Sequence, residues 1–366
     1  MTTRRHFLRH VAAAAGVMFC SCGMLDAAPA REPARKKLPV TIKGKRVKTI
    51  DVHAHCHFHE ALALIGPQET AEVMPKTKGA QEHFITLDQR LKGMDDMAID
   101  MEILSINPFW YRKDRDLAAK IVQVQNEKLA ELCASKPDRF GAFASLALQF
   151  PDLAVQQLEH AVKKLGLKGA AIGGSVAGQD FHMEKFHPVW AKAEELGCVL
   201  FIHPQSTPQL NDRFKGNGWL ANTIGNPLDT TICLSHLIFE GTLDKYPRLK
   251  ICAAHGGGFL PSYMGRSDKG CLTLPSACPG GTHGPIKKKP TDYLKQMYYD
   301  TMVFSPEGLR HLAAEVGASQ LVVGTDYPFP WTETAVDEVL AVPGFSDDDK
   351  RAVLGGTAAK LLGIKP

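Results

Sequence analysis

Short apolar runs recur eight times along this chain, and a longer stretch with helical spacing follows most of them. The runs predict strands at 47–53, 101–106, 140–145, 168–173, 198–203, 249–255, 296–301 and 320–326. The helical patterns include 115–135, 152–165, 184–196, 226–240 and 306–316. Strands that alternate with helices form a parallel sheet, and eight such units close into a (β/α)8 TIM barrel.

The alternative α/β architecture is an open, doubly wound sheet. That fold favours a GxGxxG turn after the first strand, which this sequence lacks. We therefore expect residues 47–366 to form a single barrel domain. Three long connections, at 56–86, 204–225 and 267–292, follow strands one, five and six, and we expect them to form walls over one end of the barrel.

The first thirty residues have the pattern of a cleaved export signal, with Arg4-Arg5, a short apolar run and a small-residue site ending at Ala30. The paired arginines resemble a twin-arginine motif, which predicts the twin-arginine export machinery as a partner and the periplasm as the destination. The apolar run at 11–18 is too short for a stable anchor, and an uncleaved signal would leave the protein membrane-associated. Residues 31–46 read as an exposed basic leader.

Charge and cysteine content exclude some other classes. The net charge of +4 over 366 residues gives no electrostatic footprint for nucleic acid. The cysteines after Ala30 are scattered without a CxxC motif, which gives no support to a zinc finger. Only Cys271 and Cys278, in a Gly/Pro-rich segment, are placed as a possible disulfide, and the sequence leaves their pairing open.

Polar residues stand where several predicted strands end, which is where a barrel carries its chemistry. They are His53, His55, His203, His255, Asp300 and Asp326. In IDVHAHCHFHE, four histidines alternate, but residues two apart on a strand are about 6.6 Å apart, so all four cannot share one ion. We expect His57 and His59 to continue into the loop. Histidines and a carboxylate from separate strands predict a site for one divalent metal, zinc in the first place and manganese as the alternative.

Four motifs in this order, DVHAH, FIHP, AHGGGFLPSYMGR and GTDYPFP, resemble the amidohydrolase-related (amidohydrolase 2) family and, within it, the aminocarboxymuconate-semialdehyde decarboxylases. The resemblance runs from about residue 49 to the C-terminus. It implies that the metal ligands are His53, His55, His203 and Asp326. It also implies that His255 activates a metal-bound water, and that Arg266 reaches a neighbouring subunit's site, which makes the protein a homodimer.

The resemblance implies a metal-dependent decarboxylase of a small unsaturated or aromatic carboxylic acid. The same metal site would serve a hydrolase of an amide, ester or lactone, and a non-catalytic metal- or solute-binding protein is a remote alternative. Arg266 could hold a substrate carboxylate, and the rings of Trp110, Tyr111 and Trp219, in predicted loops, could stack on a planar substrate.

Overall fold

The computed structural model describes residues 38–74, 86–275 and 286–365. The expected export signal lies outside these residues. Eight parallel strands form the framework: β3 (Ile50–His55), β4 (Met101–Ser105), β5 (Phe140–Ala142), β6 (Gly169–Ile172), β7 (Val199–Ile202), β8 (Lys250–Ala253), β9 (Tyr298–Asp300) and β10 (Leu321–Val322). All eight predicted strands are present, each within a few residues of its expected bounds.

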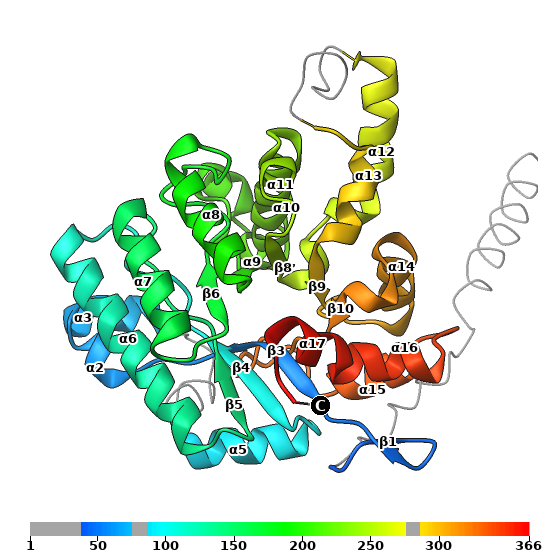
Figure 1. Ribbon diagram of the computed structural model, residues 1–366, viewed down its shortest axis with the longest axis horizontal. Helices are drawn as coiled ribbons and strands as arrows, with labels where there is room; N and C mark the ends of the chain where they lie inside the picture. Colours follow the sequence, from blue (N-terminus) through cyan, green and yellow to red (C-terminus); the bar gives the residue numbers. More distant parts are fainter. Residues whose placement is uncertain (1–37, 75–85, 276–285, 366) are drawn as a thin grey trace, which may run out of the picture. The chain divides into compact units, whose positions relative to one another are not determined.

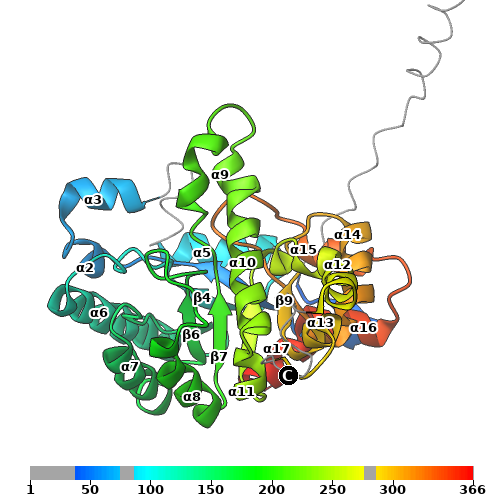
Figure 2. The same ribbon diagram turned by 90° about the horizontal axis from the view of Figure 1, so that it is seen from above.

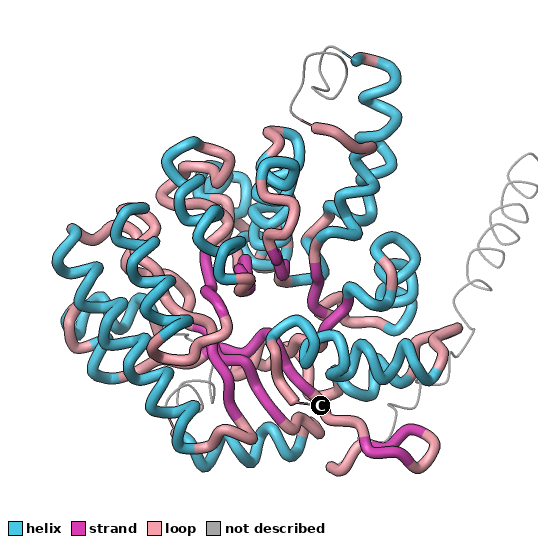
Figure 3. The backbone as a smooth tube through the Cα atoms, in the orientation of Figure 1, coloured by secondary structure: helices cyan, strands magenta, loops and turns pink. Residues whose placement is uncertain are grey.

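The strands close into a ring. Regular pairing joins β3-β4-β5 and β6-β7-β8-β9-β10. A parallel bridge between Ala144 and Ala170 links β5 to β6, and a bridge between Asp51 and Val323 links β3 to β10. The sheet is therefore a barrel, as predicted, with the first and last strands side by side; Figure 3 shows the strands inside and the helices around them.

Helices follow the strands and pack outside them (Figure 1). They are α2 (His59–Leu62), α3 (Gly66–Val73), α5 (Leu87–Asp96), α6 (Arg115–Ser135), α7 (Pro151–Lys163), α8 (His187–Leu196), α9 (Leu220–Thr223), α10 (Gly225–Phe239), α11 (Thr242–Lys245), α12 (Leu260–Thr273), α13 (Pro290–Tyr293), α14 (Pro306–Val316), α15 (Ala335–Leu340), α16 (Asp347–Arg351) and α17 (Thr357–Leu362). No helix within the described ranges is long and apolar enough to cross a membrane.

Two apolar clusters build the core. The larger lies between the strands and the outer helices. The smaller fills the barrel with the inward side chains of the strands, among them Ile50, Val199 and Phe201, and it includes Ala358 and Leu361 of α17. Because Ile50 and Val199 begin their strands, α17 covers the N-terminal end of the barrel. The predicted polar residues lie at the opposite, C-terminal end of the barrel.

The long connections carry more structure than the sequence indicated. The first contains α2 and α3 and the second contains α9, and Figure 2 shows α3 and α9 on the side toward which the arrow of β7 points. The third requires a correction, because 267–292 begins inside α12 and ends inside α13, so this connection follows a helix rather than a strand. Within the expected leader, β1 (Thr41–Ile42) and β2 (Lys45–Arg46) form a hairpin, and Val40 and Ile42 are buried.

Candidate metal centre

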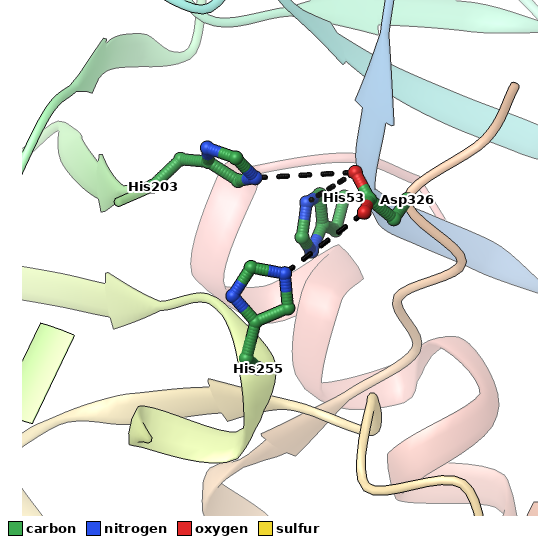
Figure 4. Close-up of side chains that lie close together, drawn as sticks. All are labelled: His53, His203, His255 and Asp326. Carbon is green, nitrogen blue, oxygen red and sulfur yellow. Dashed lines mark ion pairs between the residues drawn. The ribbon is translucent and has the colours of Figure 1, made fainter. Parts of the chain in front are cut away.

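Histidine and aspartate side chains from four strands meet at the C-terminal end of the barrel. His53 lies in β3, His203 and His255 follow β7 and β8, and Asp326 follows β10. One ligand atom from each lies within 4.8 Å of those of the other three. Figure 4 shows the three imidazoles facing the carboxylate. The sequence therefore predicted a set of residues that the fold does bring together.

His55 joins the same cluster from β3. Its Nε2 lies 3.1 Å from Nε2 of His53 and 2.8 Å from Oδ1 of Asp326. Its Nδ1 lies 3.0 Å from the hydroxyl oxygen of Ser105, which fixes the ring orientation. The Nε2 atoms of His203 and His255 are each 3.9 Å from an oxygen of Asp326.

The protonation states of these groups suit a cation. Neither ring nitrogen of His203 has a hydrogen-bond partner among the described residues, although the side chain is buried. Burial lowers the pKa of His55 and that of His203, which keeps both rings neutral and able to coordinate. Burial opposes ionisation of Asp326, but the charge of His53 holds the pKa of this carboxyl well below its usual range. Neutral imidazoles beside a carboxylate fit a divalent ion.

His53 is buried against two carboxylates. Burial alone would lower its pKa, but Asp326 and Asp300 outweigh that effect and raise the pKa to about 10. The site thus attracts positive charge, which a bound cation would supply in place of the proton.

Asp300, at the end of β9, organises two of these histidines. Its Oδ2 accepts from Nδ1 of His53 at 2.6 Å and from the backbone N–H of His255 at 3.0 Å. Its Oδ1 accepts from the backbone N–H groups of Gly256 and Met302 at 2.8 and 3.1 Å. The sequence placed Asp300 at a strand end but gave it no role. A buried carboxylate behind a ligand histidine fixes the tautomer and direction of that ring.

Two of the site residues have strained backbones. His255 and Asp326 have φ angles of 55° and 59°, a region that non-glycine residues rarely adopt. Gly258, which directly follows the turn formed by residues 255–257, has φ of 67°, and a Cβ atom there would lie 2.1 Å from the backbone oxygen of Pro227. A strained backbone costs free energy and persists only where the surrounding fold maintains it. Such residues cluster at functional sites.

The other histidines of the opening motif lie apart from this cluster. His57 is buried, and burial lowers its pKa to about 3. His59 is exposed at the start of α2.

The three aromatic residues that the sequence predicted as substrate contacts lie in different surroundings. Trp110 is fully buried and donates its Nε1–H to the carbonyl of Leu146 at 2.8 Å, so its ring packs in the core of this structure. Tyr111 is buried too, and lines a separate cavity of about 340 Å³. Trp219 is 56% exposed and stacks on Trp331 with ring centroids 5.2 Å apart.

A pocket of about 620 Å³ opens beside the histidine cluster. His255 is part of its wall, together with Phe259, Phe304 and Trp331. None of these three aromatic residues was predicted from the sequence to contact substrate, although Trp331 directly follows the GTDYPFP motif. The lining is mostly apolar, which suits the ring of a small organic substrate.

The remaining candidates lie on or near α12. Arg266 is exposed and makes no hydrogen bond or ion pair with the described residues. Tyr263, three residues earlier and so on the same side of the helix, is 67% exposed. Cys271 is disulfide-bonded, and Cys278 lies outside the described residues.

Known proteins share both the sequence pattern and the fold. The amidohydrolase family matches residues 50–364. The 2-amino-3-carboxymuconate-6-semialdehyde decarboxylase of Dictyostelium discoideum is 31% identical over 283 residues, which cover 76% of this chain and 77% of the relative. The gamma-resorcylate decarboxylase of Rhizobium radiobacter is 33% identical over 289 residues, with 75% and 86% covered.

A solved structure has a similar fold. The crystal structure of dihydroxybenzoic acid decarboxylase from Polaromonas sp. JS666, with bound manganese and the inhibitor 2-nitroresorcinol, matches with a TM-score of 0.77. The identity is 28%, and the match covers 87% of this chain and 97% of the other.

Proposed function

This chain belongs to the amidohydrolase family, and from that premise we propose that it is a metal-dependent decarboxylase of a small aromatic or unsaturated carboxylic acid. The observation that carries the proposal is the convergence of His53, His203, His255 and Asp326 beside a mostly apolar pocket. The relatives that support it are decarboxylases with different names, so the reaction class is better supported than any one substrate.

His53, His55, His203 and Asp326 would hold the ion. A divalent cation bound there supplies a positive charge that lowers the pKa of water and polarises substrate oxygens. We assign zinc to this site because imidazole-rich sets suit it, and manganese is the competing assignment because the Polaromonas relative contains it. Metal analysis of the purified protein separates the two.

His255 is the residue that we assign to proton transfer. The reaction breaks the bond between a substrate carbon and its carboxylate, and the electron pair left on that carbon has to accept a proton as CO2 departs. The side chain of His255 is only 13% exposed and lines the pocket, with its Nε2 facing Asp326. An imidazole can take up a proton at a ring nitrogen and return it, and histidine is the side chain most often used for general acid–base catalysis.

The pocket supports an aromatic substrate. Phe304 and Trp331 have ring centroids 5.9 Å apart, and Trp219 stacks on the second of these rings. Such rings provide flat, apolar contact surfaces for a planar substrate.

Arg266 supports a further proposal, that the protein acts as a homodimer in which this residue holds a substrate carboxylate in the partner's site. Tyr263 on the same side of α12 exposes a large apolar surface that a partner would cover. A guanidinium without an ion pair among the described residues is available for a carboxylate.

The first experiment is CO2 release by metal-analysed protein. The panel contains 2,6-dihydroxybenzoate and other hydroxybenzoates, unsaturated carboxylic acids, and matched esters, amides and lactones. We expect CO2 from at least one acid and a loss of activity when a chelator removes the metal. Hydrolysis of an ester, amide or lactone without CO2 from any acid would overturn the proposal and assign the same site to a hydrolase.

A further inference from the structure

We propose that the chain carries a second divalent-metal site, made by Asp180, His182 and His236, outside the barrel centre. Asp180 and His182 lie in the segment between β6 and α8, and His236 lies in α10. One ligand atom of each lies within 4.8 Å of the other two. None of the three belongs to the centre described above, so this site does not depend on the proposed decarboxylase activity.

The spacing of these groups fits an ion better than direct hydrogen bonds. Nε2 of His236 lies 3.7 Å from Oδ2 of Asp180, which is too far for a hydrogen bond of about 2.9 Å. Ligand atoms held at about 2.1 Å from one ion stand roughly 3 to 4 Å apart. Nδ1 of His182 is buried and has no hydrogen-bond partner in the described part of the chain. A buried nitrogen without a partner is costly, and coordination would satisfy it.

A carboxylate stands behind one of the ligands. Oε1 of Glu240, the residue directly after α10, is 3.9 Å from Nδ1 of His236, an electrostatic contact rather than a hydrogen bond, while the Nε2 atom of the same ring faces Asp180. Histidine ligands of metals commonly point their second nitrogen at a carboxylate. The imidazoles of His182 and His236 lie almost parallel, with centroids 4.6 Å apart and 25° between the planes.

The segment that carries Asp180 and His182 is held firmly in place. Phe181, between them, is fully buried, and its carbonyl accepts from Nε1 of Trp190 at 2.9 Å. The carbonyl of His182 lies 3.0 Å from Nε2 of His187, whose Nδ1 is 3.2 Å from the hydroxyl of Tyr246. Two ligands are thus fixed on a packed segment and the third on a helix, which is the preorganisation that metal binding needs.

The ligand types at this second site indicate which class of ion it would bind. Two imidazoles and one carboxylate suit a borderline transition ion such as Zn2+, whereas Mg2+ and Ca2+ prefer oxygen ligands. A bound ion would connect the segment after β6 to α10, which also carries Asn226 and Pro227 in the wall of the substrate pocket. We therefore expect the site to have a structural role and to stabilise the folded chain against unfolding.

The test compares zinc binding by the full chain and by two variants. His236→Gln removes a ligand whose side chain is 36% exposed, which limits the risk to folding. His160→Gln removes an exposed helix histidine in α7 and is the matched control. After equilibration with buffered free Zn2+, bound zinc is counted by mass spectrometry, and the melting temperature is measured with and without the ion.

We expect His236→Gln to bind one zinc fewer per chain than the wild type, and to lose part of the zinc-dependent rise in melting temperature. His160→Gln should match the wild type. Modification of histidines by diethyl pyrocarbonate, mapped by peptide mass, should show that zinc protects His182 and His236. Equal zinc content in the wild type and His236→Gln, or no protection of these two rings, would overturn the proposal. The difference between the two proteins is informative whether or not the barrel centre catalyses decarboxylation.

Discussion

At the scale of single residues, we expect decarboxylation to depend on His255 and metal binding not to depend on it. His255→Asn keeps a polar side chain but removes the imidazole that would transfer the proton. We expect the variant to retain its metal and to release CO2 about 10²- to 10⁴-fold more slowly. Rate and metal content are measured on the same preparation. Unchanged turnover with the metal still bound would show that another group moves the proton.

Asp300 provides a second residue-scale prediction. Asp300→Asn is nearly isosteric but removes the charge behind His53 and weakens the acceptor for the turn at His255. We expect a 10- to 100-fold loss of metal affinity, measured by competition with a chelator. Asp292→Asn, at an exposed aspartate on α13, should leave the affinity unchanged. An affinity equal to wild type for Asp300→Asn would remove this residue from the metal centre.

The sequence could predict the cluster because each of its members follows an apolar run that reads as a buried strand. It could not assign a role to Asp300, whose partners are a ring from β3 and backbone N–H groups after β8 and β9. Such contacts have no local signature. The burial of Trp110 could not be predicted for a different reason, because a tryptophan in a predicted loop has the same sequence signal whether its ring faces the pocket or the core.

At the scale of elements, strand and helix positions were predictable because a parallel barrel repeats one simple pattern. Helix α6 matches its predicted range of 115–135, and the 306–316 pattern matches α14. The third long connection was misplaced because α12 contains two glycines, Gly265 and Gly270, and few buried apolar residues, so its pattern resembles a loop. Its helical state depends on packing against α13 and α14.

Gly258 makes a testable contribution to the turn between β8 and α12. Gly258→Ala adds a Cβ atom 2.1 Å from the carbonyl oxygen of Pro227, at φ of 67°. We expect this turn to shift and to carry His255 out of position, with a lower rate of CO2 release. Gly344→Ala is the matched control, because φ there is 82° but no atom lies within 4 Å of the added Cβ. We expect both substitutions to lower the free energy of unfolding by about 1 kcal/mol through backbone strain, which chemical unfolding measures. Only Gly258→Ala should also lose activity.

At the scale of the whole molecule, the proposed dimer predicts complementation between two inactive variants. Arg266→Ala lacks the residue supplied to the partner's site, and His255→Asn lacks the proton-transfer group. In a mixed dimer, one of the two sites has both residues intact. Random mixing should therefore restore about a quarter of the wild-type activity, measured as CO2 release after co-refolding or co-expression. If the mixture stays as inactive as its parts, Arg266 acts within its own subunit or not at all.

The proposed export route gives a second prediction at this scale. Replacement of Arg4 and Arg5 by lysine keeps the charge of the N-terminus but removes the paired arginines that the route reads. We expect the protein to move from the periplasmic to the cytoplasmic fraction, followed by immunoblotting of cell fractions. Periplasmic protein in normal amounts would show that another signal or route directs it.

Because the first and last strands of the barrel lie side by side, the metal centre can be completed only late in translation. His53 is supplied by β3 and Asp326 follows β10, so the two ends of the catalytic domain have to meet before all the ligands are present. A nascent chain still emerging from the ribosome has the early histidines but not the late carboxylate. Ion capture at full affinity therefore marks a finished polypeptide, and a chain that stops early would be unable to acquire its cofactor.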